Sequence, residues 1–463
     1  MTKKYGPRSA AADKALKPSF MAPTLLKYAS IFLVLTLNAV ANDQVPLNAS
    51  PVLGTLHRFL RNESRVVNEL QQFDVDIWQA TPELVDIYTP LSGPGLPEAL
   101  RAIPSTSSPI YYPYQQRQVE PWNLASFENT TFHSAYHPLY EIDDFVYQLA
   151  AEHPSTVSVI HLGHSGEGRE MRGLKISSGS TGVKKTGYRK GVDPSQKLGF
   201  VVAGAQHARE WVATAAALYI AHALVATASE KYSLSPLLGT YDFYIIPAPN
   251  PDGYDFTWES DRFWYKNRQV MGPAEKCIGL DMNRNWGYKW KANAMYFKNP
   301  ATPVDPCSHW FPGHRPFEAP EVNNLANYIT TLPNLLAFVD LRSYGQMISS
   351  PYSYSCERVP KDAEDQIEAA TGAAHALKLA HGTKFKIATL CESLYRAPGN
   401  IVDWMYARAQ IKYSYAVHLR DTGTYGFSLP PEWIRPVGEE TGNMVKYLAG
   451  FIAKQLKKKI GFA

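Results

Sequence analysis

The chain has 463 residues, of which 45% are hydrophobic and 19% are charged. This length exceeds what one core usually requires, and the apolar content can bury a large domain and a smaller one, which excludes disordered and fibrous classes. The 46 basic and 42 acidic residues give a formal net charge of +4 without a long basic block, which argues against a nucleic-acid-binding protein. Four cysteines in so long a chain also exclude a small disulfide scaffold.

The first 41 residues have the layout of a secretory signal. Basic residues precede an apolar run over residues 28–38, and a small-residue cleavage motif follows at 39–41. The run is too short to span a membrane. Met21 lies just before it, so one hypothesis places the true start there and treats residues 1–20 as an extension of the gene model. The alternative interpretation of the run is a buried strand or helix of a cytosolic protein.

Secretion would have consequences for the rest of the chain. The four cysteines would lie in an oxidising compartment, where pairing is expected. Three Asn-X-Ser/Thr sequences, at Asn48, Asn62 and Asn129, would become glycosylation sites.

Residues 42–103 are predicted to form a small α/β unit. A helix is expected over residues 64–72, a strand over 75–78 and a second helix over 97–103. Residues 104–130 are rich in Pro, Ser, Tyr and Gln, which is typical of a linker, so we place the domain boundary there.

Residues 131–463 alternate between apolar, β-rich runs and helical patterns. This alternation predicts the α/β fold class, with one mixed, mostly parallel sheet and helices on both of its faces. The expected strands cover residues 156–162, 198–203, 241–247, 335–341 and 412–419. The expected helices cover residues 141–152, 211–227, 320–331, 363–379 and 432–458.

Polar clusters follow four of these strands, at the place where open α/β sheets bind ligands. They cover residues 206–211, 250–253, 342–346 and 418–423. In the first cluster an imidazole and a carboxylate, His207 and Glu210, stand three residues apart and could converge on one zinc ion. The same spacing recurs elsewhere in the chain, so it is the position between an apolar strand and a long helix that favours this pair.

Together, the motifs resemble those of the zinc carboxypeptidases of the A/B type, which remove carboxy-terminal residues from peptides. They occur in the family's order and approximate spacing over nearly the whole chain. The motifs are His207-Ala-Arg-Glu-Trp, Asn250-Pro-Asp-Gly-Tyr, Asp281-Met-Asn-Arg-Asn-Trp, Ser343-Tyr, Tyr395 and Leu419-Arg-Asp-Thr-Gly. The small unit, with its sequence Phe73-Asp-Val-Asp-Ile-Trp, is similar to a shortened form of the family's inhibitory propeptide and implies a zymogen.

The resemblance implies a role for individual residues. His207 and Glu210 would be two of the zinc ligands. Asn283 and Arg284 would hold the terminal carboxylate, because a planar guanidinium binds a carboxylate bidentately, and Tyr395 would close over the substrate. The complete set expected to contact substrate is Arg209, Tyr265, Asn283, Arg284, Ser343, Tyr344 and Tyr395.

Specificity and disulfide pairing also follow from the resemblance. Val402 would lie near the base of the specificity pocket and would suit an apolar terminal side chain. The implied disulfides join Cys277 to Cys307 and Cys356 to Cys391.

Three positions depart from the family's catalytic pattern. The third zinc ligand should be a histidine, but the chain has Arg342, whose guanidinium has no available lone pair and would repel the metal. The catalytic glutamate is replaced by His418, which can act as a base but lacks the charge of a carboxylate. Tyr265 stands where an arginine polarises the scissile carbonyl, and losing such a donor typically costs about 100- to 1,000-fold in rate.

These departures predict an inactive carboxypeptidase-like protein that binds peptide or protein C-termini. They are similar to those of a fungal branch of the family linked to cell-wall organisation and biogenesis, which implies a secreted or vacuolar fungal protein. Two other functions stay open. One is an active metallocarboxypeptidase that releases apolar residues with His418 as its base, and the other is a structural secreted protein with a vestigial pocket.

Two states of the metal position also stay open. In the first, Arg342 pairs with Glu210 and the site holds no metal. In the second, His418 joins His207 and Glu210 as a replacement ligand for one zinc ion.

Overall fold

The computed structural model describes residues 50–460, except 62–65, 67–68, 71–72, 74, 114–121, 180–195, 274–275 and 294–302. The predicted signal region, Asn48, Asn62 and most of the helix predicted over residues 64–72 therefore lie outside the described residues. The described part forms a four-stranded sheet and an eight-stranded sheet within one compact unit. No helix in this part of the chain is long and apolar enough to cross a membrane.

The four-stranded sheet forms the small domain, which we define as residues 50–111. Its strands are β1 (Val52–Leu60), β2 (Asp76–Ala80), β3 (Leu84–Pro90) and β4 (Thr106–Tyr111), in the order β2-β3-β1-β4. The short helix α2 (Glu98–Arg101) buries Leu100 against Phe59, Val85 and Ile87 of this sheet. The predicted strand near residues 75–78 and the helix near 97–103 are thus present.

The linker predicted over residues 104–130 begins too early, because β4 lies inside that stretch. This strand pairs antiparallel with β1 and buries Ile110. An edge strand has a neighbour on one side only, so it tolerates Pro109, which removes a backbone donor. A proline within a Ser-rich stretch is what made the segment look like a linker.

The eight-stranded sheet organises the large domain. Its order is β11-β10-β12-β9-β7-β8-β6-β5, and its four central strands, β12, β9, β7 and β8, run parallel. The strands are β5 (Val157–His164), β6 (Glu170–Ile176), β7 (Leu198–Ala203), β8 (Tyr241–Ile246), β9 (Leu335–Arg342), β10 (Met347–Ser350), β11 (Lys386–Thr389) and β12 (Tyr413–His418). The predicted mixed, mostly parallel sheet is therefore confirmed at its centre, while its outer strands pair antiparallel except for β10 and β11.

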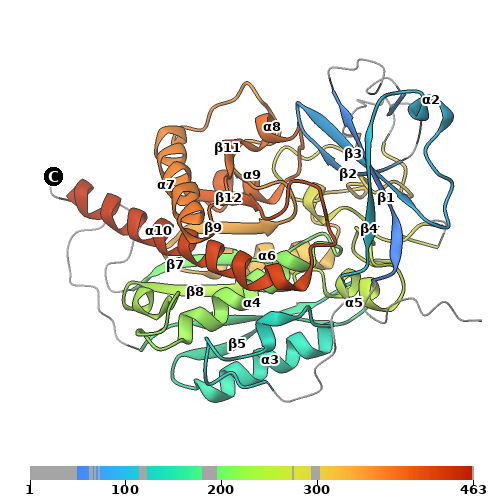
Figure 1. Ribbon diagram of the computed structural model, residues 1–463. Coiled ribbons are helices and arrows are strands. Elements are labelled where there is room, and N and C mark those ends of the chain that lie inside the picture. The colour runs from blue at the N-terminus through green and yellow to red at the C-terminus, as the bar shows by residue number, and fades with distance from the viewer. Residues whose placement is uncertain are drawn as a thin grey trace, which may run out of the picture. The chain divides into compact units, whose positions relative to one another are not determined.

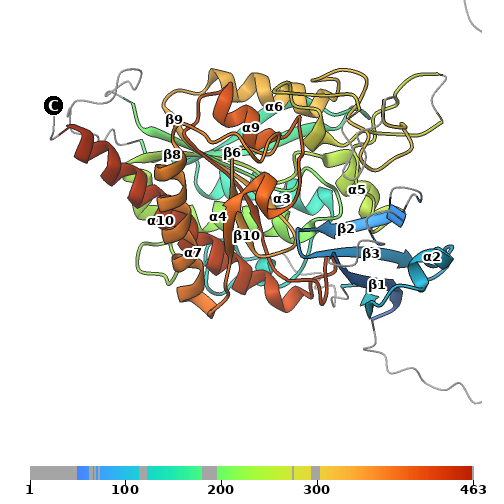
Figure 2. The same cartoon turned by 90° about the horizontal axis from the view of Figure 1, so that it is seen from above.

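Helices cover both faces of this sheet (Figure 1, Figure 2). The α3, α4, α7 and α10 side chains share one apolar cluster, and those of α6 and α9 share the cluster on the other face. The helices are α3 (Leu139–Glu152), α4 (Trp211–Val225), α5 (Pro251–Glu259), α6 (Pro320–Thr331), α7 (Ala363–His381), α8 (Leu390–Ser393), α9 (Ile401–Ala407) and α10 (Ile434–Ile460). Short 3₁₀ helices are η1 (Phe132–Ser134), η2 (Ser235–Gly239), η3 (Met282–Arg284) and η4 (Pro431–Trp433).

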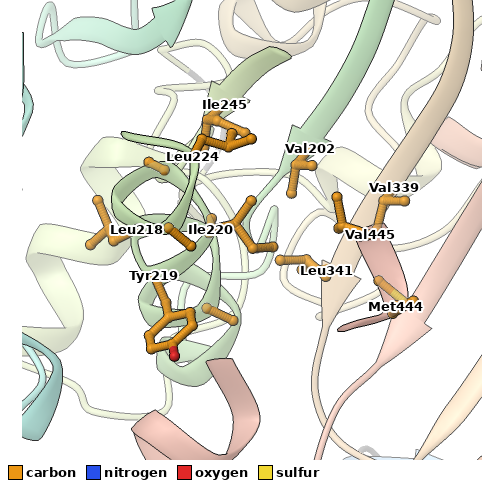
Figure 3. Packing of buried hydrophobic residues seen from close by; sticks show 14 of the residues in the cluster. Val202, Leu218, Tyr219, Ile220, Leu224, Ile245, Val339, Leu341, Met444 and Val445 are labelled. Carbon is orange, nitrogen blue, oxygen red and sulfur yellow. The ribbon is translucent and has the colours of Figure 1, made fainter. Parts of the chain in front are cut away.

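Helix α4 is the central element of the larger cluster. Every side chain from Trp211 to Leu224 is buried, as expected of a helix that is apolar on all sides. Figure 3 shows Ile220 of this helix directed toward Val202 and Leu341, and Leu224 beside Ile245. This packing gives the loop that precedes α4 a rigid base.

Candidate functional site

The site lies where three parallel neighbours, β7, β9 and β12, end at the same edge of the sheet. Arg342 ends β9, His418 ends β12, and the two residues are direct partners in the strand register. His207 and Glu210 follow β7, and Glu210 occupies the position just before α4 begins. The parallel arrangement therefore brings together three motifs, the first and last of which lie more than 200 residues apart in the sequence.

A cavity of about 70 Å³ opens at this edge. Its apolar wall comes from Leu390, Leu394, Ala397 and Ala416. Strand β2 of the small domain covers it with residues 77–80. The predicted site residues that line it are His207, Glu210, Tyr265, Asn283, Arg284, Arg342, Ser343, Tyr344, Tyr395 and His418.

Arg342 occupies the position at which zinc carboxypeptidases have a histidine as the third zinc ligand. It donates to both carboxylate oxygens of Glu210, from Nε to Oε2 at 3.0 Å and from Nη2 to Oε1 at 3.0 Å. Nη2 also contacts Nδ1 of His207. Glu210 accepts a further hydrogen bond at 3.0 Å from the backbone N–H of Ser343. Both oxygens of the carboxylate are thus committed to protein donors.

His207 has the hydrogen-bonding partner that is typical of a zinc ligand, but its other ring nitrogen contacts Arg342. Its Nε2 lies 2.8 Å from Asp281 Oδ1, and a histidine ligand typically donates its outer ring N–H to such a carboxylate. With that N–H directed to Asp281, Nδ1 accepts from Arg342. The Tyr265 ring stacks on the imidazole with ring centroids 3.7 Å apart.

The residues present do not fit a zinc ion. Zinc requires at least three protein ligands with free lone pairs, but Arg342 offers none at the third position and its cationic guanidinium donates to both His207 and Glu210. Among the described residues, no group of three or more His, Cys, Asp or Glu side chains could hold a metal ion. The hypothetical ligand set with His418 is therefore not assembled in this structure.

Burial and the neighbouring charges shift the pKa values of the titratable side chains in this cluster. Burial alone would raise the pKa of Glu210, but the adjacent guanidinium of Arg342 and then His207 keep that pKa well below its ordinary value. Burial lowers the pKa of His418 to about 3, helped by the positive charge of Arg342. Burial also raises the pKa of Asp340, which lies behind Arg342, to about 7. His418 is therefore a neutral imidazole at neutral pH, where the family has a carboxylate.

A second group of residues forms what we call the carboxylate cradle: Asn283, Arg284 and Tyr395. Arg284 donates from Nη2 to the Tyr395 hydroxyl at 2.7 Å and from Nη1 to the Asn283 carbonyl oxygen at 3.0 Å. Asn283 is held by its Oδ1, which accepts from the backbone N–H of Ile401 at 3.0 Å. Burial raises the pKa of Tyr395, so its hydroxyl remains a neutral donor. These three residues lie together as the sequence predicts.

Two predicted residues have different surroundings from those expected. Arg209 was expected on the substrate path, but it is 1% exposed and donates to Asp76 of the small domain at 2.9 and 3.1 Å. Val402, the second residue of α9, is fully buried in the apolar cluster on that face of the sheet and is not among the residues that line the cavity. Leu390 and Ala416 line the apolar wall in its place.

Other predicted features lie away from the cavity. The structure contains the two disulfides, Cys277–Cys307 and Cys356–Cys391, that the resemblance implied. Asn129 lies exposed in a turn, so glycosylation there stays a prediction.

Sequence reasoning missed the charged groups behind the site. Asp281, Asp340 and Asp76 each bind one of the basic site residues. Asp281 opens a motif that was recognised for its Asn and Arg, so that motif contained a signal. Asp76 lies in the motif that is similar to the family's propeptide, but that motif did not indicate Arg209 as its partner, and nothing around Asp340 indicated Arg342.

Comparison with known proteins agrees with this geometry. A zinc carboxypeptidase family model, M14, matches residues 142–444, and the chain belongs to this family. An inactive metallocarboxypeptidase ECM14 of Blastomyces gilchristii (strain SLH14081) is 34% identical over 420 residues, covering 82% of this chain and 68% of the relative. A protein of the same name from Paracoccidioides brasiliensis (strain Pb03) is 33% identical over 422 residues, with the same coverage. The crystal structure of thrombin activatable fibrinolysis inhibitor superposes with a TM-score of 0.73 at 28% identity, covering 87% of this chain and all of that one.

The relatives and the site lead to the same description of the chain. The metal position is filled by a guanidinium, the catalytic glutamate is a histidine, and the relatives carry the name inactive. The protein is a pseudoenzyme of the zinc carboxypeptidase family.

Proposed function

We propose that the protein is a non-hydrolytic receptor for the carboxyl termini of peptides or proteins. The observation that carries this proposal is the carboxylate cradle, which keeps its three residues together beside the lost metal position. Arg284 donates to two neutral oxygens, and the Asp281 carboxylate oxygen lies 3.8 Å away. An incoming carboxylate would offer this guanidinium a closer charged partner.

The apolar wall supports a preference for ligands with an apolar terminal residue. Leu390, Leu394, Ala397 and Ala416 line the cavity next to the cradle, and none of them carries a group that could pair with a charged side chain. A basic terminal residue would lose its hydration there without gaining a partner.

Hydrolysis is disfavoured by the same structure. The oxygens of Glu210 are bound to Arg342, His418 lacks a carboxylate's charge, and Tyr265 can supply one neutral donor only. An active carboxypeptidase that uses His418 as its base is the alternative that these contacts oppose. A vestigial pocket without any ligand is the other alternative.

We test the proposal by titrating a fluorescent peptide that ends in leucine, as the free acid and as the amide. Strand β2 covers the cradle, so both the intact chain and the Asp76→Ala variant, which loosens β2, are titrated. The free acid should bind about 10- to 100-fold more tightly than the amide, because the amide cannot form the charged pair with Arg284. Mass spectrometry should show the peptide uncut.

Two variants distinguish recognition of the terminal carboxylate from nonspecific binding of the peptide. Arg284→Ala should abolish the preference for the free acid, whereas Arg396→Ala, an exposed arginine one residue from Tyr395, should leave it unchanged. Equal binding of acid and amide by both forms of the protein would refute the receptor proposal and favour a vestigial pocket. Release of free leucine that chelators stop would favour the enzyme.

We further infer a role in fungal cell-wall organisation and biogenesis, in the secretory pathway or the vacuole. The support is the sequence resemblance described above together with the fungal origin of the relatives. Deletion of the gene should increase sensitivity to wall-binding dyes. The wild-type gene should restore resistance, and an Arg284→Ala gene should not; full rescue by the variant would separate the wall phenotype from the cradle.

A further inference from the structure

The covered cleft raises the question of whether the small domain is an inhibitor to be removed or a permanent part of the molecule. We propose that it is a permanent part, held in the former catalytic cleft by residues that no longer serve catalysis, and that it stays bound when the chain between the two domains is cut. The inference does not depend on binding of carboxyl termini, because it rests on contacts between the two domains.

The first contact is a cation held by aromatic rings. The guanidinium carbon of Arg209 lies 4.8 Å from the centre of the Tyr265 ring and 4.5 Å from that of Phe427. From this position Nη1 donates to the carboxylate of Asp76 on β2. Burial alone would raise the pKa of Asp76, but Arg209 holds that pKa far below its ordinary value, so the pair is ionised.

Tyr265 gives this contact a direct link to the loss of catalysis. The family has an arginine at this position, and a second guanidinium beside Arg209 would repel it. The tyrosine instead offers a ring face, to which a buried cation is attracted. The same substitution that removes the carbonyl-polarising group therefore stabilises the contact with the small domain.

The second contact is a buried polar network centred on Asp86 of β3. Its carboxylate is fully buried and accepts from Arg58 Nε and Nη2, each at 2.7 Å, and from the Tyr344 hydroxyl at 2.7 Å. Arg58 Nη2 also donates to the Thr422 carbonyl oxygen at 2.6 Å. Gln79 on β2 donates to the Tyr344 carbonyl oxygen at 2.9 Å. Tyr344 and Thr422 belong to the large domain, so separation would exchange these hydrogen bonds for bonds to water, and a bond to a charged group contributes net stability beyond that exchange.

The third contact is an apolar cluster that both domains share. Trp78 of the small domain packs against Phe263 and Phe427 of the large domain, with ring centroids 4.7 and 4.9 Å apart. Tyr88 and Tyr344 belong to the same buried cluster. An apolar centre combined with buried ion pairs resembles a domain core more than the polar interface of a transient complex.

The test uses the full chain with a protease recognition sequence inserted between Pro113 and Trp122. After cleavage the two fragments should elute together in gel filtration without denaturant, even after dilution to about 0.1 μM. Stable interfaces have dissociation constants of about 1 nM, so at this concentration the fragments should stay bound. Separation of the fragments in native buffer would overturn the proposal.

Variants of the cleaved protein assign the effect to particular contacts. Asp76→Ala and Tyr344→Phe should each raise the dissociation constant about 10- to 100-fold, because each removes a buried hydrogen bond to a charged group. Tyr265→Arg should raise it as well, by placing a like charge beside Arg209. Glu83→Ala, which breaks the exposed pair with Lys386, is the matched control and should change it less than about threefold.

A second measurement uses the wild-type chain and so does not depend on how well any variant folds. Hydrogen exchange of the intact wild-type chain should show the β2 and β3 amides protected to the same free energy as those of β7. Independent opening of the small domain at much lower free energy would contradict permanent docking. An unchanged dissociation constant for Asp76→Ala and Tyr344→Phe would refute the role given to these contacts. Loss of peptide binding alone would leave the gel-filtration result intact, so the two proposals fail separately.

Discussion

The metal position and the carboxylate cradle lie in the same cleft and have changed to very different degrees. At the metal position the polar side chains are bound to one another: Arg342 to Glu210, and His207 to Asp281. In the cradle, Arg284 donates to neutral oxygens of Tyr395 and Asn283. The difference shows that the side chains at the ends of β7, β9 and β12 can be replaced while the neighbouring η3 segment keeps Asn283 and Arg284 in place for the proposed carboxylate binding.

The largest expected effect comes from breaking the ion pair that fills the metal position. Glu210→Ala should lower the free energy of unfolding by about 3–5 kcal/mol, because it leaves the buried Arg342 without its partner. Urea unfolding of the purified protein measures this. The double variant Glu210→Leu with Arg342→Leu should recover most of the loss, since it removes both charges. Equal destabilisation of the single and double variants would contradict the pairing.

A smaller effect should appear in the pH dependence of stability. Burial and Arg342 hold the pKa of His418 at about 3 in the folded protein, below the ordinary value of 6.5. Between these values the unfolded chain binds the proton and the folded chain does not, so stability falls as the pH is lowered. His418→Gln should remove a loss on the order of 3 kcal/mol between pH 7 and pH 3.

The comparison of the two proteins isolates His418 from other titrating groups. Asp340, whose pKa burial raises to about 7, acts in the opposite direction in both. A His418→Gln protein with the same pH profile as the wild type would show that this imidazole is not held neutral.

The smallest effect is expected in the cradle. Tyr395→Phe removes the hydroxyl that accepts from Arg284 and should lower the free energy of unfolding by about 1 kcal/mol. Thermal unfolding measures the change. A loss as large as that of Glu210→Ala would mean that the cradle is a structural ion centre like the metal position, and the contrast between the two would disappear.

The sequence alone was sufficient to predict the central strands of the large sheet and the replacement of the family's catalytic residues. Parallel strands bury both faces and have continuous apolar runs, so β7, β8, β9 and β12 were predictable. The replacement of a zinc ligand by Arg342 was visible in the residues, and so was its pairing with Glu210 as one of two alternatives. Both follow from residue chemistry, which needs no three-dimensional information.

The remaining features depend on contacts between distant segments. Strand β4 was missed because an edge strand with a proline has no distinctive pattern, and its pairing with β1 crosses more than 45 residues. Arg209 was assigned to the substrate path because the aspartate that binds it lies 133 residues away in the small domain. Pairings of this kind are set by tertiary packing, and local sequence carries no record of them.

Zinc content of the purified protein tests the central claim most directly. The wild-type chain and Arg342→His are incubated with zinc, dialysed and measured by elemental analysis. The wild type should hold essentially none. The variant should hold about one zinc ion per chain, because His207 keeps its carboxylate partner and Glu210 would be released to join it and the new histidine. About one zinc ion per chain in the wild type would contradict the account, since Arg342 would then not fill the metal position.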